Sequence, residues 1–464
     1  MWCSRDVGAF IVLQKRKSMK QYLKLIFTVG VVILGTVGTY LLIEKKSATV
    51  NMPTLSSRGA NPSSEFLNAQ KAVDFYRQEI QLHPKKIKNY IELAQLLLQE
   101  GRITGNNNEY IPKAQYLIEQ ALNRDPDNYD AMVTKATMFA TLHRFANAKE
   151  TIERAITKQP HTAFGYGILC DAQVELGNYD EAIKACDKMS GIRPDLRSYA
   201  RVSYLRELHG DIEGAIEAMK MAAEAGVTGQ ENRAWVLYNL GKLYLNQNKL
   251  DTAAFMFNGI LEERPNYAHA LHGIALVNAQ RGKFEEAISL HKQAIATLNE
   301  PAFFESLGEV YQAIGNVDEA TRSYDRAEEL YVEEKKNGED NDLEMAHFLA
   351  GHDRRLSDAL TLARGAVERR PSIFGYETLA LALYKNDMNK EAQEAIQKAM
   401  KLGTQDASIY FIAGSIAHML DDKSAAQTLL KKALSINRNF SLIHIRDAER
   451  MLNGGEPLTQ MAPQ

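Results

Sequence analysis

The sequence predicts an all-α protein in which helical hairpins stack into a solenoid, preceded by one transmembrane helix. Small residues, mostly alanine, recur about every 34 positions, and prolines recur at the same interval. The N-terminal part also contains a long stretch without charge. A hairpin that cannot bury its apolar face alone is stabilised by stacking on its neighbours, so this period predicts a repeat array. The recurring residues are Ala148, Ala182, Ala215, Ala253, Ala287, Ala320, Ala359, Ala392 and Ala426, with Pro126, Pro160, Pro194, Pro265 and Pro371.

The N-terminal segment is predicted to anchor the chain in a membrane. Residues 25–43, from Leu25 to Ile43, are uncharged and long enough to cross the apolar core of a bilayer. Residues 1–24 are basic, with a true start possible at Met19, and this charge bias predicts a cytoplasmic N-terminus. The chain would then be a single-pass membrane protein whose repeats lie in the periplasm or another extracytoplasmic space. A cleaved signal peptide is the alternative. Residues 44–63, with two prolines and several serines, are predicted to be a linker.

Residues 64–439 are predicted to hold about ten repeat units, of which the first are degenerate. In two units the first helix carries the pattern Leu-Gly-x-x-Tyr, at Leu240, Gly241 and Tyr244 and at Leu307, Gly308 and Tyr311. The second helix of the same units carries Ala253, Phe257 and Ile260, or Ala320, Tyr324 and Ala327. These motifs resemble the tetratricopeptide repeat (TPR). The resemblance implies a right-handed superhelix with a concave groove that binds a protein or peptide.

Three further segments interrupt or end the repeats. Residues 103–111, rich in glycine and asparagine, are expected to form a loop inside the second unit. Residues 440–453 are expected to form a C-terminal capping helix. Its outer face, with Arg446, Asp447, Glu449 and Arg450, is expected to be exposed to solvent. Residues 454–464 are expected to be a flexible tail.

Composition and motifs argue against several functional classes. The net charge of −3 gives no basic surface for nucleic acid. The usual catalytic motifs and phosphate-binding loops do not occur in a fitting context, so the sequence predicts neither an enzyme nor a cofactor. Cys170 and Cys186 are interpreted as small buried residues of one hairpin. A disulfide between them is the alternative, and it requires an oxidising compartment.

The TPR resemblance implies a set of groove residues on the first helices of the central units. They are Arg197, Arg201, Tyr204, Glu207, Trp235, Tyr238, Asn239, Lys242, Asn246, His269 and His272. For Trp235 the alternative is packing against residues 226–233, which lengthen the junction between two units. His269 and His272 could share a helix face, which keeps a metal site as a minor alternative, whereas His291 is expected to fill an aromatic position in the packing.

The sequence therefore favours a non-catalytic, membrane-tethered scaffold that binds a protein partner in its concave groove. One alternative is a cytosol-facing receptor, similar in layout to mitochondrial import receptors, which also have an N-terminal anchor followed by TPRs. Another is an enzyme or metal carrier that uses the region of His269, His272 and Arg201. The partner itself cannot be named from the sequence.

Overall fold

The computed structural model describes residues 53–56, 64–455 and 457 of the chain. The chain divides into two units, Met1–Ser56 and Ser57–Gln464, and the described helices belong to the second. The predicted anchor at residues 25–43, its basic flank and most of the linker and tail lie outside the described residues. Within the described residues, no helix combines the length and the apolar character that a membrane span requires.

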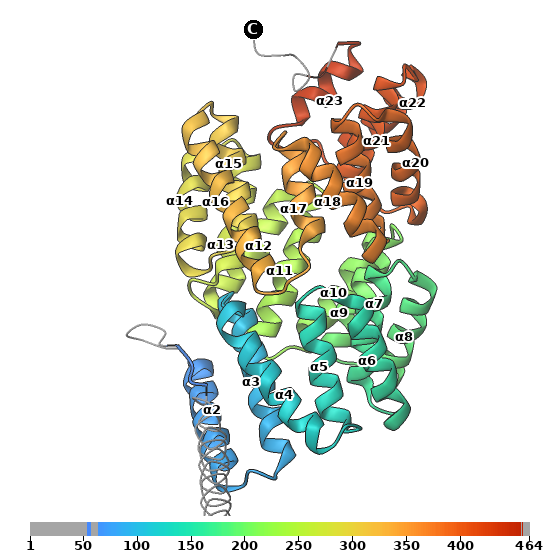
Figure 1. The fold of residues 1–464 in the computed structure, drawn as a ribbon. Coiled ribbons are helices and arrows are strands. Elements are labelled where there is room, and N and C mark those ends of the chain that lie inside the picture. The colour runs from blue at the N-terminus through green and yellow to red at the C-terminus, as the bar shows by residue number, and fades with distance from the viewer. Residues whose placement is uncertain (1–52, 57–63, 456, 458–464) are drawn as a thin grey trace, which may run out of the picture. The chain divides into compact units, whose positions relative to one another are not determined.

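The described part of the second unit is built from helices, as the sequence predicts (Figure 1). A single helix, α2 (Ser64–Leu82), precedes the hairpins, and a short helix, α23 (Ile445–Leu452), follows them. The first hairpins are α3 (Ile87–Thr104) with α4 (Asn107–Arg124), α5 (Tyr129–Thr141) with α6 (Phe145–Lys158), α7 (Ala163–Glu175) with α8 (Tyr179–Ile192), α9 (Leu196–Leu208) with α10 (Ile212–Glu224), and α11 (Glu231–Asn246) with α12 (Leu250–Glu263). The later hairpins are α13 (Ala268–Gln280) with α14 (Phe284–Thr297), α15 (Pro301–Ala313) with α16 (Val317–Lys336), α17 (Asp342–Gly351) with α18 (Leu356–Arg369), α19 (Ile373–Lys385) with α20 (Asn389–Ala399), and α21 (Ala407–Met419) with α22 (Lys423–Ile436). A short 3-10 helix, η1 (Met400–Leu402), follows α20.

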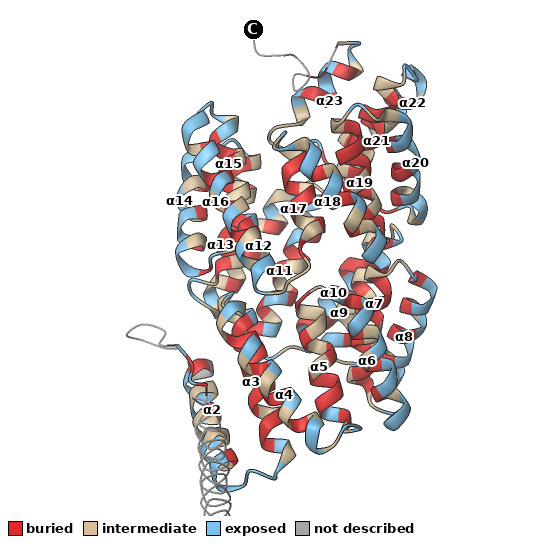
Figure 2. Cartoon of the chain, in the orientation of Figure 1, coloured by how far each residue is buried: buried red, intermediate tan, exposed pale blue. Residues whose placement is uncertain are grey.

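Close contact between the two helices of a hairpin explains the small residues of the repeat. A side chain added at Gly241 on α11 would place its Cβ 2.3 Å from Phe257 Cε1 on α12. Phe257 is fully buried, and the recurring Ala253 and Ala287 are fully buried as well. Figure 2 shows the exposed residues of outer helices such as α8 and α20 on the side that faces solvent. The repeat therefore encodes the spacing of the helices, and the large residues fill the space that remains.

The segment at residues 103–111 differs from the predicted loop. α3 continues to Thr104 and α4 starts at Asn107, so only two residues join the helices. Tyr110 and Ile111 are buried against α3, and Lys113 pairs with Glu109 one turn earlier at 2.9 Å. Their burial holds the segment in a helix despite its glycine and asparagine, because tertiary packing outweighs local propensity. The extra residues lengthen both helices of this hairpin.

The C-terminal helix is also shorter and less exposed to solvent than expected. α23 begins at Ile445, and Asp447 is buried with an exposed fraction of 2%. Asp447 Oδ2 lies 3.9 Å from His444 Nδ1, which precedes the helix. The helix therefore turns one acidic residue inward, toward the array.

Units that are far apart in the sequence contact each other, which the repeat pattern does not predict. Four hydrogen-bonded pairs join residues between 192 and 196 positions apart; three involve the end of a first helix and one the start of the second helix α8. The contacts are Arg370 with Glu175 at 2.9 Å, Ile373 N with Tyr179 Oη at 2.8 Å, Thr404 Oγ1 with Leu208 O, and Asn437 Nδ2 with Leu245 O at 3.3 Å. Figure 1 shows the corresponding helices, with α19–α21 beside α7–α10. We call these contacts the return contacts, because the chain returns along itself there.

Candidate functional site

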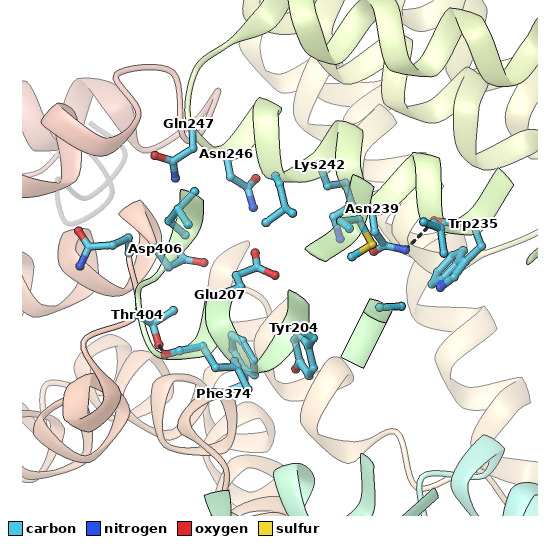
Figure 3. A pocket seen from close by; sticks show the side chains of 17 residues that line it. Tyr204, Glu207, Trp235, Asn239, Lys242, Asn246, Gln247, Phe374, Thr404 and Asp406 are labelled. Carbon is cyan, nitrogen blue, oxygen red and sulfur yellow. Dashed lines mark hydrogen bonds between the residues drawn. The ribbon is translucent and has the colours of Figure 1, made fainter. Parts of the chain in front are cut away.

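A cavity of about 440 Å³ lies on the inner side of α9 and α11. Its opposite wall comes from residues much later in the chain, Phe374 on α19 and residues 404–406 before α21. Figure 3 shows the side chains of both walls around one space. We call it the return cavity, since a return contact closes it: Thr404 Oγ1 donates to the carbonyl of Leu208 at the end of α9.

The polar wall of the return cavity is one face of α11. Trp235, Asn239, Lys242 and Asn246 are spaced by four, three and four residues, which places them on the same side of a helix. Leu240, between them in sequence, is buried on another face. Asn239 Nδ2 donates to the carbonyl of Trp235 at 2.8 Å, which orients the amide. Trp235 remains 42% exposed, so its ring is available at one end of the cavity.

The facing wall is fixed by backbone geometry. Gly403 has a positive φ of 72°, and Asp406 then caps α21 by accepting a hydrogen bond from Ser408 N at 2.7 Å. Gly210, just after α9, approaches the carbonyl of Gly403 so closely that a Cβ there would lie 2.5 Å from the oxygen. Glycine at position 210 therefore lets the two passes of the chain meet beside the cavity.

Three charged groups set the electrostatics of the return cavity. Burial raises the pKa of Glu207 to about 7, although the ammonium of Lys242 opposes this shift. Burial also raises the pKa of Asp406, opposed by its hydrogen bonds to backbone amides and by Lys242. In Figure 3 the carboxylate of Glu207 extends into the space between Asp406 and Lys242. The cavity thus holds one ammonium and two carboxyl groups, surrounded by amide side chains of Asn239, Asn246, Gln247 and Gln405.

Six of the eleven predicted groove residues line this cavity, among them Tyr204, Trp235, Asn239 and Lys242. Glu207 and Asn246, also expected in the groove, line it too. Trp235 contacts Tyr238 and His269, with ring centroids 5.7 and 5.2 Å apart, and the residue stays 42% exposed. The predicted groove and the cavity therefore share residues on α9 and α11, and binding by these residues stays a prediction.

The two predicted groove arginines lie outside the return cavity. Arg197 is exposed, with its guanidinium 5.0 Å from the centre of the Phe164 ring. Arg201 is held by Asp171 on α7, with 2.5 Å between Nη2 and Oδ2, and it also donates to the carbonyl of Gly167. A guanidinium saturated by its own neighbours offers little to a ligand, so Arg201 joins two units instead.

Burial corrects the expectation for Tyr238, His269 and His272. Tyr238 and His272 are each 6% exposed, and the His269 side chain is 13% exposed. His272 stacks on Phe303 with ring centroids 4.6 Å apart, and its Nδ1 lies 3.3 Å from Nδ1 of the fully buried His291. Burial lowers the pKa of His269 to about 4 and that of His291 to about 3. These rings pack in the interior between units. The sequence predicts such a position for His291 only.

Cys170 and Cys186 are buried free thiols, each with an exposed fraction of 1%. Their mutual contact raises the pKa of Cys170 and lowers that of Cys186. The packing agrees with their interpretation as small buried residues. A disulfide in an oxidising compartment stays a prediction.

Sequence reasoning missed the second wall of the return cavity. Phe374, Thr404, Gln405 and Asp406 come from units far along the chain, and no local motif marks them. The available signal was indirect: a superhelix brings a later unit over an earlier one after one turn, but its pitch depends on small rotations between units.

Comparisons with known proteins agree with the helical hairpins. Family models described as Tetratricopeptide repeat match residues 238–302 and 407–440. Cellulose synthase operon protein C of Pseudomonas fluorescens is 24% identical over 184 residues, which are 38% of this chain and 14% of that protein. Protein CTR9 homolog of Arabidopsis thaliana is 26% identical over 316 residues, 65% of this chain and 27% of that protein. The aligned parts thus span only a minor share of either relative.

Solved structures show the same kind of similarity. The crystal structure of yeast Tom70 is 16% identical and covers 83% of this chain and 93% of that chain, with a TM-score of 0.37. A tetratricopeptide repeat protein from Parabacteroides merdae is 20% identical and covers 56% of this chain and 97% of that chain, with a TM-score of 0.33. These scores add no argument about function, so the family models and the hairpins themselves identify the repeats.

Proposed function

Because the chain is a tetratricopeptide repeat protein, we propose that it is a non-catalytic scaffold that holds a segment of a protein partner in the return cavity. The observation that carries this proposal is the lining of that cavity. Amide side chains stand beside the exposed ring of Trp235, and Lys242 extends from the same helix face as Asn239. This combination suits an extended peptide better than a reacting small molecule.

The chemistry of each wall indicates what such a segment would offer. Asn239, Asn246 and Gln405 can donate to and accept from peptide groups, which every partner segment carries. Trp235 and Phe374 can bury an apolar side chain, and buried aromatic anchors dominate many protein interfaces. Lys242 can pair with a carboxylate of the partner. Backbone recognition would provide affinity, and the aromatic and charged positions would provide selectivity.

The proposed location follows the charge bias of the N-terminal segment. Residues 25–43 would tether the array, with the N-terminus in the cytoplasm and the repeats on the extracytoplasmic side. A reporter enzyme that is active only after export, fused behind Gln464, should be active. Activity of a cytoplasm-specific reporter at the same position would favour the alternative, a cytosol-facing receptor.

Site-specific photo-cross-linking tests the binding site. Asn239 is replaced by p-benzoylphenylalanine in the full chain, and a second variant carries the same residue in place of Lys220. Lys220 is exposed on α10 and does not line the return cavity, so it serves as the matched control. A partner band that forms from position 239 and not from 220 supports the proposal. Equal bands from both positions, or a band only from 220, would place binding elsewhere.

A further inference from the structure

A second cavity, of about 150 Å³, gathers ionisable side chains that the proposed scaffold function does not use. It lies between α15, α17, α19 and α21 and is covered by residues 440–447 before and in α23. Its lining includes Glu305, Glu309, His352, His444 and Asp447. We call it the acidic cavity.

Three of these side chains converge on one point. Glu305 and Glu309 are one turn apart on α15, so their carboxylates project from the same face. His352, immediately after α17, brings its imidazole to them, with Nε2 3.0 Å from Glu305 Oε1. One ligand atom of each residue lies within 4.8 Å of the other two. Two ligands of one zinc ion lie at most about 4.4 Å apart, because zinc–ligand distances are about 2.0–2.2 Å, so small side-chain movements bring all three donors onto one ion.

Packing fixes the imidazole in place before any ion arrives. The His352 side chain is only 3% exposed. Its ring stacks on Tyr324, with centroids 4.3 Å apart and planes 25° apart, and meets the edge of Phe348 at 5.2 Å. A ligand that is held rigidly loses little entropy when it binds, which favours a built site over a chance meeting of surface groups.

Two polar groups of the acidic cavity lack a hydrogen-bond partner. Among the described residues, the Glu309 carboxylate accepts no hydrogen bond. The buried Nδ1 of His352 has no hydrogen-bond partner either. Lys385 also lines the cavity, but its ammonium is 2.7 Å from Asp353 Oδ1, which offsets its charge. A bound cation would supply a partner for the Glu309 carboxylate.

A second carboxylate–histidine pair faces the same space. His444 Nδ1 lies 3.9 Å from Oδ2 of Asp447, and both residues line the acidic cavity. This pair comes from the C-terminal segment, independently of α15 and α17. It could support a bound ion through water, as outer partners do in known metal sites.

We propose that Glu305, Glu309 and His352 form a binding site for a divalent metal ion, and that the ion is Zn²⁺. One imidazole nitrogen and two carboxylate oxygens are ligands that zinc accepts, and zinc binds such mixed sites more tightly than Mn²⁺ or Fe²⁺ does. Three protein ligands leave the fourth position for water. The ion would join the hairpin α15–α16 to the hairpin α17–α18 inside the array.

Metal titration of the full-length chain tests this site. The protein is purified without a histidine tag, freed of metal with a chelator, and titrated with Zn²⁺ by calorimetry and with Co²⁺ by visible absorption. The wild type should bind one ion with a tetrahedral Co²⁺ spectrum. The variants Glu309→Gln and His352→Gln should weaken that binding at least about tenfold. Circular dichroism melting checks that each variant is folded.

The matched control is Glu334→Gln on α16. Glu334 is half-buried, like Glu309, but it does not line the acidic cavity. This variant should bind the ion like the wild type. Absence of stoichiometric binding, or binding that Glu309→Gln leaves unchanged, would show that Glu305 and His352 form only a structural ion pair. Binding of Mn²⁺ in preference to Zn²⁺, lost in Glu309→Gln, would overturn the assignment of zinc.

Discussion

The return cavity and the acidic cavity are built on the same repeat but differ in how they form. The return cavity joins helices α9 and α11 to residues 374 and 404–406, which arrive from a later pass of the chain. The acidic cavity joins units that follow one another, with only the C-terminal segment added. The first is lined by amides and aromatic rings, the second by carboxylates and imidazoles.

This difference shows which positions of a repeat are free to carry function. Packing positions such as Gly241 and Phe257 are constrained by direct contact. Inner-face positions, such as Lys242 on α11 and Glu309 on α15, line the two cavities instead. The repeat therefore fixes how the helices pack. The side chains on the inner face can differ from unit to unit and so form sites of different chemistry.

The largest expected effect is a loss of stability, caused by a substitution in the helix packing beneath the return cavity. Gly241→Leu forces a side chain into the space of Phe257, and we expect it to lower the free energy of unfolding by about 3 kcal/mol or more. Gly259→Leu, on the partner helix α12, meets nothing within 4 Å and should not destabilise the chain. Urea denaturation measures both. Similar losses in the two variants would contradict the role of close helix contact.

The second prediction concerns the pH dependence of stability that arises from the buried histidines next to the return cavity. The folded pKa of His291 is about 3, below its unfolded value of about 6.5, so the unfolded chain binds more protons between these values. Stability is therefore fully present above about pH 6.5 and falls by about 1.4 kcal/mol per pH unit on acidification. His291→Leu should flatten this acidic limb, whereas His161→Leu, on an exposed side chain, should not. Equal slopes in all three proteins would show that His291 is not buried in its neutral form.

Buried glutamates should act in the opposite direction. Burial raises the pKa of Glu339 to about 8, so its folded form holds a proton that the unfolded chain releases above about pH 4.5. Its contribution to stability is present below pH 4.5 and is lost as the pH rises toward 8. Glu339→Gln should therefore reduce the loss of stability between pH 5 and 8, as measured by chemical denaturation. A steeper loss in this variant would contradict the assignment.

A smaller effect tests the return contacts. Gly210→Ala places a Cβ 2.5 Å from the carbonyl of Gly403 and also strains a backbone with a φ of 78°. Gly282→Ala carries nearly the same backbone strain, at a φ of 74°, but meets nothing within 4 Å. We expect both variants to lose about 1 kcal/mol to strain and Gly210→Ala to lose at least about 1 kcal/mol more. Equal losses in urea denaturation would mean that the return contact contributes nothing.

The smallest effect on stability should accompany an effect on binding. Lys242 is exposed, so Lys242→Ala should change the free energy of unfolding by no more than about 0.5 kcal/mol. In the chain with p-benzoylphenylalanine at position 239, the same substitution should reduce cross-linking to the partner. Lys249→Ala, on an exposed lysine that does not line the return cavity, is the control. Unchanged cross-linking in the Lys242 variant would remove this residue from the site.

The sequence predicts the hairpins well because their constraints are local. Gly241 and Gly308 leave room for the rings of Phe257 and Tyr324, and the motif of these two units reports this contact directly. The segment at residues 103–111 was predicted wrongly as a loop, because composition suggested a turn while burial of Tyr110 and Ile111 selects a helix.

The site was predictable on one wall only. The helix face of Trp235, Asn239 and Lys242 follows from the repeat register. The register alone placed Tyr238 and His272 in the groove as well, because it does not reveal how closely the next unit covers them. Asp406 and the triad of Glu305, Glu309 and His352 depend on distances between units, which accumulate from small rotations that no local motif records.

A distance between spin labels at Asn246 and Gln405 tests most directly whether two passes of the chain form one cavity. Both residues line the return cavity, on opposite walls, and the labels are introduced on cysteines in a chain that lacks the native ones. Pulsed electron resonance should give one short, narrow distance in the full chain, and this distance should broaden in the Gly210→Ala variant. A long or broad distribution in the unmutated array would contradict the return contacts and the binding site that we build on them.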